Sequence, residues 1–419
     1  MDDDYSGDAD VRFLNKGGYM GYVWCIGGGQ MQIPVVEEIK KMGYMAIVSD
    51  GDKDCACASK ADIFLNVDIF DVDGHIKASE GMEETLMGVF ACGIDAPVTT
   101  SAIAKRFHLP GAQYDMAQIL HDKHMFRISQ KALGYLCPDF KYIAGGKSLQ
   151  VNKVDNDLVV KPCLNSGSRG VTLISKGSPP IDVQRAIDLA HTNSRDGGAL
   201  VEERLNGTEH TVETLVDKDG VVHPCFITDR LFDYSMGAME VGLRNPSTLP
   251  PYIQRRAFKL AKDMAFDYMI DNSPLKLDIM VTENGIYVLE ATTRMSGGFD
   301  CQYLVPSATG MNPIRAGLQV CLGQDVDKRL LSPSKDKVAV SNSLWPPVGK
   351  ITSITGLTEA KKIKGVEKIF LRYKVGDVIE PYINCARRFC FIITSGDSHG
   401  EAMGIFNEVK NVLKVEVEE

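Results

Sequence analysis

The sequence predicts a multidomain protein of the α/β and α+β classes, with an open parallel sheet first and a small α+β domain last. Three observations support this prediction. The 419 residues are enough for two or three domains that each have a core. A strand–helix–strand pattern with a glycine-rich first turn occupies residues 22–48. From Lys335 onward, short apolar runs separated by Gly and Pro precede one final helix, which is typical of a small α+β domain.

Composition and charge exclude several classes of protein. The apolar and charged fractions, 44% and 24%, are ordinary for a soluble globular protein. The net charge of −9 gives no basic surface for a nucleic acid or an anionic membrane, and no apolar run approaches the ~20 residues that span a bilayer. The acidic N-terminus also lacks the layout of a signal peptide. The sequence therefore predicts no nucleic-acid partner and no membrane.

The 11 cysteines are an odd number scattered through apolar segments, which is typical of reduced thiols in the cytoplasm. Cys55 and Cys57 have no second Cys or His pair nearby, so we interpret them as packing residues and not as zinc ligands. The sequence therefore predicts a cytoplasmic protein with mostly buried, free thiols.

The first domain is predicted to be Rossmann-like and to occupy residues 19–115, after a leader over residues 1–18. Its strands alternate with helical patterns, which favours an open, mostly parallel sheet with helices on both faces. The first helix ends near Met42, and Gly43 fits its C-cap. The predicted units of this sheet lie at residues 22–26, 45–48, 63–67 and 93–98.

The glycine turn at residues 27–29 leaves three interpretations open. It resembles the opening of a dinucleotide site, but Gln30, Met31 and Gln32 replace the rest of G-x-G-x-x-G, so that support is weak. A tight strand-to-helix turn explains the glycines equally well. The helix N-terminus could also hold an anionic group of a small substrate.

A β-hairpin is predicted at residues 275–298, where two apolar runs flank Asn284-Gly285. Asp278 lies in the first run and Glu290 ends the second. A two-residue Asn-Gly turn pairs Glu283 with Ile286 and puts the two acids on opposite faces. A three-residue loop at 283–285 instead pairs Thr282 with Ile286 and sets Asp278 directly across from Glu290. We favour the three-residue loop, because its last position needs the positive φ that Gly285 supplies.

Two carboxylates side by side repel each other unless a cation lies between them. One or two carboxylates, completed by water and phosphate oxygens, are the ligands that suit Mg²⁺ on a nucleotide. A surface hairpin with two solvated acids is the alternative. The rest of the chain decides between the two.

The middle of the chain carries further candidate features. A loop at residues 163–171 holds Ser166, Gly167, Ser168 and Gly170, whose backbone N–H groups can surround phosphate oxygens. It lacks the ending of a Walker A loop, and a plain β-hairpin turn is the alternative. The predicted helices are 121–133, 252–266 and 312–322, and the predicted strands include 157–161, 199–205, 209–213, 338–341, 349–353, 366–373 and 389–394, before a last helix at 399–412.

Taken in chain order, a set of motifs in this sequence resembles the ATP-grasp superfamily. The pattern comprises Asp122-Lys123 opening a helix, Val160-Lys161-Pro162, the Gly/Ser loop, Val201 to Leu205 with Glu209, Asp278, and Glu290-x-x-x-Arg294. The resemblance covers about residues 20–325 and implies a two-subdomain ATP-grasp core at 116–330. The segment 331–419, with Pro347-Val-Gly-Lys-Ile351, Gly356-Leu357, Gly365-Val366 and Gly376-Asp377, is more loosely similar to the C-terminal domain of L-amino-acid ligases.

The resemblance implies an ATP-dependent ligase that joins a carboxylic acid, expected to be an amino acid, to an amine through an acyl phosphate. Its implied cofactors are ATP and Mg²⁺, with Mn²⁺ as a substitute, and its relatives suggest a homodimer. A bicarbonate-activating enzyme of the carboxylase or carbamoyl-phosphate type is one alternative. A nucleotide-binding regulator without catalysis is the other.

The resemblance also implies roles for residues. Lys123 and Lys161 would contact ATP phosphates, with Lys161 and Arg294 as the catalytic residues. Arg294 would hold the substrate carboxylate or the acyl phosphate, and residues 296–298 would add backbone N–H groups. The implied nucleotide set is Lys123, Lys161, Ser166, Gly167, Ser168, Gly170, Glu202, Glu203, Arg204, Leu205 and Glu209, where Glu209 would bind ribose and Glu203 is equally well explained as a solvated acid.

Asp278, Glu290 and Thr292 would be the metal ligands. Thr292 is a departure, because the superfamily usually has E-x-N and the chain has Glu290-Ala291-Thr292. This puts a second metal ion in question. The substrates would bind between the first domain, the hairpin and residues 297–315, with Arg315, Tyr303, His223 and Arg244 as candidates that helix or surface roles explain better.

Overall fold

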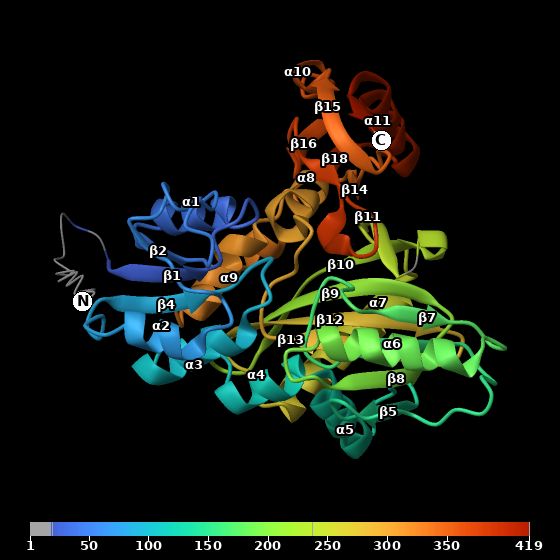
Figure 1. Cartoon of the computed structure of the whole chain (residues 1–419). Coiled ribbons are helices and arrows are strands. Elements are labelled where there is room, and N and C mark those ends of the chain that lie inside the picture. Colours follow the sequence, from blue (N-terminus) through green and yellow to red (C-terminus); the bar gives the residue numbers. More distant parts are fainter. Residues whose placement is uncertain (1–17, 19, 237, 419) are drawn as a thin grey trace, which may run out of the picture.

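The computed structural model describes residue 18, residues 20–236 and residues 238–418. The predicted leader therefore lies outside the described residues, apart from Gly18. Figure 1 shows a parallel sheet near the N-terminus, two antiparallel layers in the middle and a compact C-terminal lobe. The expected mixture of α/β and α+β parts is confirmed. None of the described helices is long and apolar enough to cross a membrane.

The first sheet has the strand order β3-β2-β1-β4, and all of its pairs are parallel. The prediction of a strand at 93–98 is wrong, because the fourth strand lies earlier and this segment leads into a helix that starts at Pro97. The fourth strand was not predicted because Gly88 interrupts its apolar run. The glycine is required there, since a Cβ on it would lie only 2.9 Å from the carbonyl oxygen of Cys321. The strands are β1 (Tyr22–Ile26), β2 (Met45–Ser49), β3 (Ile63–Leu65) and β4 (Leu86–Phe90).

Helices cover both faces of this sheet, as predicted. Alternate residues of β1 point to opposite faces, so Val23 packs against α1 while Trp24 packs against the α2 and α3 side. The face toward α1 is completed by α9, a helix from far along the chain whose Leu318 is fully buried. The helices are α1 (Ile33–Lys41), α2 (Val72–Ala78), α3 (Pro97–Phe107) and α9 (Pro313–Cys321).

The glycine turn between β1 and α1 is packed tightly against the chain after β2. The backbone N–H of Gly28 donates to Asp50 Oδ2 at 2.7 Å, and a Cβ on Gly28 would lie 2.4 Å from Cys55 Sγ. Cys57 is fully buried and its N–H donates to the carbonyl of Gly28. This packing supports the interpretation of a tight turn, with Cys55 and Cys57 as packing residues.

A four-stranded antiparallel sheet, in the order β5-β8-β6-β7, forms one layer of the central region. Its preceding helix α5 begins and ends as predicted: Asp122 accepts hydrogen bonds from the N–H groups of His124 and Met125, and Gly134 ends the helix at φ 79°. Helix α6 packs on the sheet. The elements are α4 (Tyr114–His121), α5 (Lys123–Leu133), β5 (Phe140–Ile143), β6 (Leu158–Pro162), β7 (Thr172–Ile174), α6 (Pro180–Asn193) and β8 (Ala199–Glu203).

The second layer is an eight-stranded sheet in the order β13-β12-β9-β10-β11-β14-β18-β16. Its last three strands, β14, β18 and β16, belong to the predicted C-terminal domain at 331–419. One sheet therefore continues from the predicted ATP-grasp core into that domain. The helix predicted at 252–266 is confirmed as α7, which packs on β9, β10 and β12. The elements are β9 (Thr208–Val216), β10 (Val222–Asp233), β11 (Met239–Asn245), α7 (Pro251–Asp267), β12 (Ser273–Thr282), β13 (Gly285–Thr292), β14 (Val338–Asn342), β16 (Val366–Leu371) and β18 (Cys390–Gly396).

The C-terminal lobe adds a three-stranded sheet, β17-β15-β19, and helix α11, which packs on β18. The predicted strands and final helix of this lobe are confirmed, while β17 and β19 were not predicted. These elements are α10 (Leu357–Ala360), β15 (Gly349–Thr355), β17 (Val378–Ile379), α11 (His399–Val412) and β19 (Lys414–Glu418). The remaining helical segments are α8 (Val305–Thr309), a π-helix at Asp300–Leu304 and 3₁₀ turns at Tyr234–Met236, Lys328–Leu331 and Cys385–Arg387.

The β12–β13 hairpin sets Asp278 directly opposite Glu290, as predicted, but by a different route. The three-residue loop is wrong: Thr282 pairs with Gly285, so the loop is only two residues long. The register then shifts by one residue between Asp278 and Ile279. Leu289 is the extra residue of this β-bulge, and it restores the alignment of the two carboxylates.

Arg127 of α5 holds the bulge. Its Nη2 donates to the carbonyl of Leu289 at 2.8 Å and its Nη1 to that of Val288 at 3.3 Å. Its Nε donates to Glu202 Oε1 at 2.8 Å, so the fully buried guanidinium connects β13 of one layer to β8 of the other. Gln130 Nε2 also donates to the carbonyl of Val288, at 3.0 Å.

Replacing Arg127 by Lys should lower the free energy of unfolding by about 3 kcal/mol, because one ammonium cannot reach Glu202 and two carbonyls at once. Urea unfolding of both proteins measures the difference. Arg255→Lys, on the exposed face of α7, is the matched control and should leave stability unchanged. Equal stability of Arg127→Lys and wild type would contradict this role.

Candidate active site

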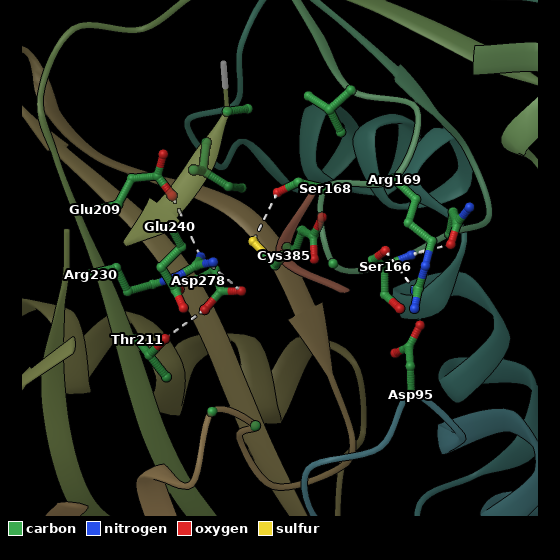
Figure 2. Close-up of a pocket in the computed structure, with 18 of the residues that line it drawn as sticks. Asp95, Ser166, Ser168, Arg169, Glu209, Thr211, Arg230, Glu240, Asp278 and Cys385 are labelled. Atoms are coloured by element: carbon green, nitrogen blue, oxygen red, sulfur yellow. Dashed lines mark hydrogen bonds and ion pairs between the residues drawn. The ribbon is translucent and has the colours of Figure 1, made fainter. Parts of the chain in front are cut away.

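A cavity of about 530 Å³ lies between the two central layers. Figure 2 shows side chains from both layers pointing into it. Residues 93–95 of the first domain lie at its wall. The C-terminal lobe completes the wall with Arg372, Cys385, Ala386, Arg388 and Phe391. The predicted site residues that line it are Lys123, Lys161, Ser166, Gly167, Ser168, Glu202, Glu203, Arg204, Leu205, Glu209, Asp278, Glu290 and Arg294.

Six predicted residues lie elsewhere. Gly170 and Thr292 are not part of the cavity wall. The four candidate substrate contacts have structural partners instead: Arg315 pairs with Glu38, His223 with Asp217 and Arg244 with Asp229, and the ring of Tyr303 packs on Phe299 and Phe370.

The two predicted phosphate lysines are held in place by different means. Lys123, in the first turn of α5, donates to the carbonyl of Asn165 at 2.7 Å and lies 3.2 Å from Glu290 Oε1. Lys161, near the end of β6, lies 2.7 Å from Glu202 Oε2. Burial lowers the pKa of Lys161, and the carboxylate of Glu202 opposes that shift. Both ammonium groups therefore reach the cavity with fixed orientations.

The loop between β6 and β7 is both a hairpin connection and a wall of the cavity, so the two interpretations of it are compatible. Gly167, Ser168 and Gly170 have φ of 66°, 57° and 71°, which curls the loop backbone. A Cβ at Gly170 would lie 2.6 Å from Asn193 Cβ, so this glycine is required for packing. The N–H of Cys385 donates to the carbonyl of Gly167, which ties the loop to the C-terminal lobe.

Glu202, one of the predicted nucleotide-binding residues, lies on the cavity wall. Its carboxylate lies between Arg127 and Lys161, and it is only 3% exposed. Burial alone would raise the pKa of Glu202, but the two cations outweigh burial and lower it. Its main structural effect is therefore to orient Lys161.

The neighbouring predicted residues remain available to a nucleotide. Glu203 accepts a hydrogen bond from the N–H of Asp139 at 3.1 Å, and the guanidinium of Arg204 stacks on Tyr234. Glu209 lies 3.5 Å from Arg230, and burial raises the pKa of Glu209 to about 7.

The two predicted metal ligands lie on one rung of the sheet, Glu290–Asp278–Thr211 across β13, β12 and β9. Thr211 Oγ1 donates to Asp278 Oδ1 at 2.8 Å. Asp278 Oδ2 lies 2.6 Å from Lys276 Nζ and 3.2 Å from Arg230 Nη1. Burial opposes ionisation of Asp278, but Arg230 and Lys276 hold its pKa well below the usual range.

These residues can supply part of a metal site. Within the described ranges, no group of three or more His, Cys, Asp or Glu side chains is arranged to hold a metal. Asp278 and Glu290 are adjacent carboxylates, and the Glu290 side chain is 43% exposed. Two carboxylates completed by phosphate and water fit a hard divalent ion. Thr292 is not part of the cavity wall, and its Oγ1 is buried without a hydrogen-bond partner in the described structure.

Arg294 lies where β13 meets the first domain. Its Nη1 donates to the carbonyl of Met295 at 3.0 Å, and its Nη2 lies 3.7 Å from Asp95 Oδ1. Despite its burial, Asp95 has a pKa lowered to about 2, because His121 and Arg294 favour its charged form. The Ser296 N–H donates to Glu213, so residues 297 and 298 are left as the backbone donors expected here.

Comparison with protein families agrees with this geometry. Residues 154–302 match the model of the ATP-grasp domain. This segment is an ATP-grasp domain. Residues 343–418 match the model of the L-amino acid ligase C-terminal domain 2, so the looser similarity of the tail is also confirmed.

Several proteins are similar to this chain over most of its length. The uncharacterized protein y4rH of Sinorhizobium fredii is 24% identical over 88% of this chain and 77% of its own length. The L-amino acid ligase from Bacillus licheniformis has a TM-score of 0.78 at 19% identity, over 96% of this chain and 100% of the other. The biotin carboxylase domain of Hydrogenobacter thermophilus 2-oxoglutarate carboxylase, solved with MgADP and bicarbonate, has a TM-score of 0.71 at 14% identity, over 95% and 91%. At these identities the structural matches show the fold.

Several residues of the ATP-grasp cavity were not identified from the sequence. Thr211 and Lys276 could have been, because they alternate with Glu209 and Asp278 at the two-residue period of one strand face. Asp95 follows the carboxyl end of a parallel strand, where α/β sheets bind ligands. Arg230, Glu240, Asp300 and Arg388 carry no comparable signal. The strands of Arg230 and Glu240, β10 and β11, were not predicted, and Asp300 and Arg388 lie outside the strands.

Glu213, beside this cavity, is a fully buried acid. Its Oε2 accepts from Ser296, and its Oε1 has no hydrogen-bond partner in the described structure. Burial raises the pKa of Glu213 to about 7 from an ordinary value of 4.5. The folded protein therefore binds this proton more tightly than the unfolded chain, and stability is lost as pH rises from about 4.5 to 7.

Glu213→Gln should remove this loss. Relative to the variant, wild type should lose about 3 kcal/mol of unfolding free energy between pH 5 and pH 8. Urea unfolding at the two pH values measures it, with Glu359→Gln on the exposed side of α10 as a control that keeps the wild-type pH dependence. Parallel profiles for wild type and Glu213→Gln would contradict the assignment.

Proposed function

We propose that the protein is an ATP-dependent carboxylate–amine ligase that forms an acyl phosphate and releases ADP and phosphate. The observation that carries the proposal is one cavity that combines Lys123 and Lys161, the paired carboxylates Asp278 and Glu290, and Arg294. These groups match the needs of phosphoryl transfer to a carboxylic acid. Two anions must be held together, and the charge on the transferring phosphoryl group must be neutralised.

The phosphate end lies between Lys161, Lys123 and the β6–β7 loop. Point charges on two lysines suit phosphate oxygens, and the curled loop backbone brings further N–H groups to the same space. Residues 202–205 and Glu209 line the adjoining space, which is where we place the nucleoside.

Mg²⁺, or Mn²⁺ in its place, would be held by the carboxylates of Asp278 and Glu290. When bound, it would neutralise charge on the phosphates. The two carboxylates face each other across the hairpin, so they are already arranged for a shared cation.

The acid substrate is placed at Arg294. The planar guanidinium can bind a carboxylate or the acyl phosphate through two hydrogen bonds, and its Nε is buried with no partner in the described structure. Asp95 fixes the other side of the same guanidinium.

The amine substrate is placed at Asp300. This residue is 1% exposed, lies on the cavity wall and accepts from Thr228 Oγ1 at 2.9 Å. Among the described residues no Lys, Arg or His lies within ion-pair distance of it, and burial raises its pKa well above the usual range. An incoming ammonium would supply the missing positive charge. A carboxylate of raised pKa could then accept a proton from the nitrogen before it attacks.

The reaction balances with these groups. A carboxylate oxygen of the acid attacks the γ-phosphorus of ATP, and ADP leaves. The amine nitrogen then attacks the acyl carbon, the C–O bond to phosphate breaks, and the nitrogen loses a proton. The likeness to an L-amino acid ligase supports an amino acid as the acid substrate, and the eleven free cysteines support a cytoplasmic location.

Phosphate release from ATP–Mg²⁺ tests the proposal, measured over a panel of carboxylic acids with and without a panel of amines. Release that requires one acid and one amine would establish the ligase and name both substrates. Release with bicarbonate alone would replace it with a carboxylating activity. Binding of ATP without release for any pair would favour a regulator.

Arg294→Lys should lower kcat/KM by roughly 10²-fold or more, because a bidentate contact to the carboxylate becomes a single point charge. Steady-state kinetics with the acid varied measure the change. Arg315→Lys is the matched control, since Arg315 lies outside the cavity, and it should keep wild-type kinetics. A near-normal kcat/KM for Arg294→Lys would contradict the role of Arg294.

A further inference from the structure

Lys276 is a cation built into the sheet beside the two acids. Lys276 lies two residues before Asp278 on β12, so both side chains are on the same face of the sheet. It pairs with Thr292 of β13 on one side and Glu213 of β9 on the other, and we call this row the rung of Lys276. Its ammonium lies 2.6 Å from Asp278 Oδ2, and the residue is 8% exposed on the cavity wall. A positive charge is therefore fixed within hydrogen-bond distance of Asp278, one of the predicted metal ligands.

The hydrogen bonds of Asp278 limit how many ions it can bind. A carboxylate offers about four acceptor positions. Two donors already hydrogen-bond to Asp278, Thr211 to Oδ1 and Lys276 to Oδ2, and the guanidinium of Arg230 lies 3.2 Å from Oδ2. About two acceptor positions are left, and the two cations beside Oδ2 repel a second metal ion at this carboxylate. Glu290 is also partly used, because Lys123 lies 3.2 Å from its Oε1.

The rung of Lys276 offers little to a second ion. The Oγ1 of Thr292 is buried, and Thr292 is not part of the cavity wall. Glu213 is fully buried and bonded to Ser296. A hard divalent ion needs about six oxygens, and this side of the rung presents an ammonium instead.

We propose that the ammonium of Lys276 takes the place of a second divalent ion, so that the site binds one divalent ion with each nucleotide. The inference rests on the proposed nucleotide site. Lys276 then acts as a catalytic residue that neutralises the phosphoryl group during transfer, while Asp278 and Glu290 would hold the single ion.

Counting bound Mn²⁺ tests this directly. Mn²⁺ is titrated into the protein saturated with the non-hydrolysable analogue AMPPNP, and free Mn²⁺ is read from its electron paramagnetic resonance signal. We expect about one bound Mn²⁺ per chain in wild type. A count near two would overturn the proposal. The assay contains no acid or amine, so a chain that failed the phosphate-release test would still give a count.

The double variant Lys276→Met/Thr292→Asn tests the cause. Methionine keeps the apolar stem but removes the charge, and asparagine adds a longer oxygen donor on the same rung. We expect its count to rise to about two, with AMPPNP binding retained as the sign of a folded site. A count that stays at one would contradict the role given to Lys276. Lys218→Met, on the surface, is the matched control and should keep the wild-type count.

Catalysis gives a second readout. The rate of wild type should stop rising once all ATP is MgATP, and Lys276→Met should lower kcat by roughly 10²-fold. The double variant should need further free Mg²⁺ for its full rate. A wild-type rate that continues to rise with free Mg²⁺ would also overturn the proposal.

Discussion

The buried guanidinium of Arg127 is the contact on which both halves of the site depend. It binds Glu202 of one layer, and Glu202 in turn orients Lys161. It also binds the two carbonyls at the bulge of the other layer. Without the bulge, the tight loop of the hairpin would leave Asp278 and Glu290 out of register. One side chain therefore fixes the positions of both the predicted phosphate-binding lysine and the paired carboxylates.

Charge balance is the second constraint on this cavity. Most of its buried acids are held in their charged form by a neighbouring cation, as Arg230 and Lys276 do for Asp278. Paired charges of this kind can stay buried in the absence of substrates. The pairing also limits what the carboxylates can bind, because few of their acceptor positions stay open. Asp300 has no such ion-pair partner, because no Lys, Arg or His of the described structure lies within ion-pair distance of it, and burial raises its pKa. The place without a counter-charge is where we expect a cationic substrate group.

Local signals in the sequence were enough for much of this account. Asp122 and Gly134 define the ends of α5, and the alternation of the hairpin located Asp278 and Glu290 on one face. The spacing of lysines, loop and acids was also enough to recognise the ATP-grasp core. These features depend on neighbours in the chain, or on spacing that the fold requires.

Long-range contacts could not be predicted in this way. Arg127 reaches carbonyls more than 160 residues away, so its role depends on the finished fold. The ion pairs of Glu202 could not be predicted for the same reason, because its strand was evident in the sequence but the two cations beside it were not. The bulge at Leu289 has no turn residue to mark it, and α9 shows no sign in its own sequence that it covers the first sheet.

The central claim is that the acid is activated by phosphoryl transfer to its own carboxylate. The most direct measurement is to label both carboxylate oxygens of the acid substrate with ¹⁸O and analyse the phosphate released during ligation by mass spectrometry. The account predicts one ¹⁸O in each phosphate, because the bridging oxygen leaves with phosphorus when the amine attacks carbon. Phosphate released without ¹⁸O would contradict the acyl phosphate and with it the chemistry assigned to this cavity.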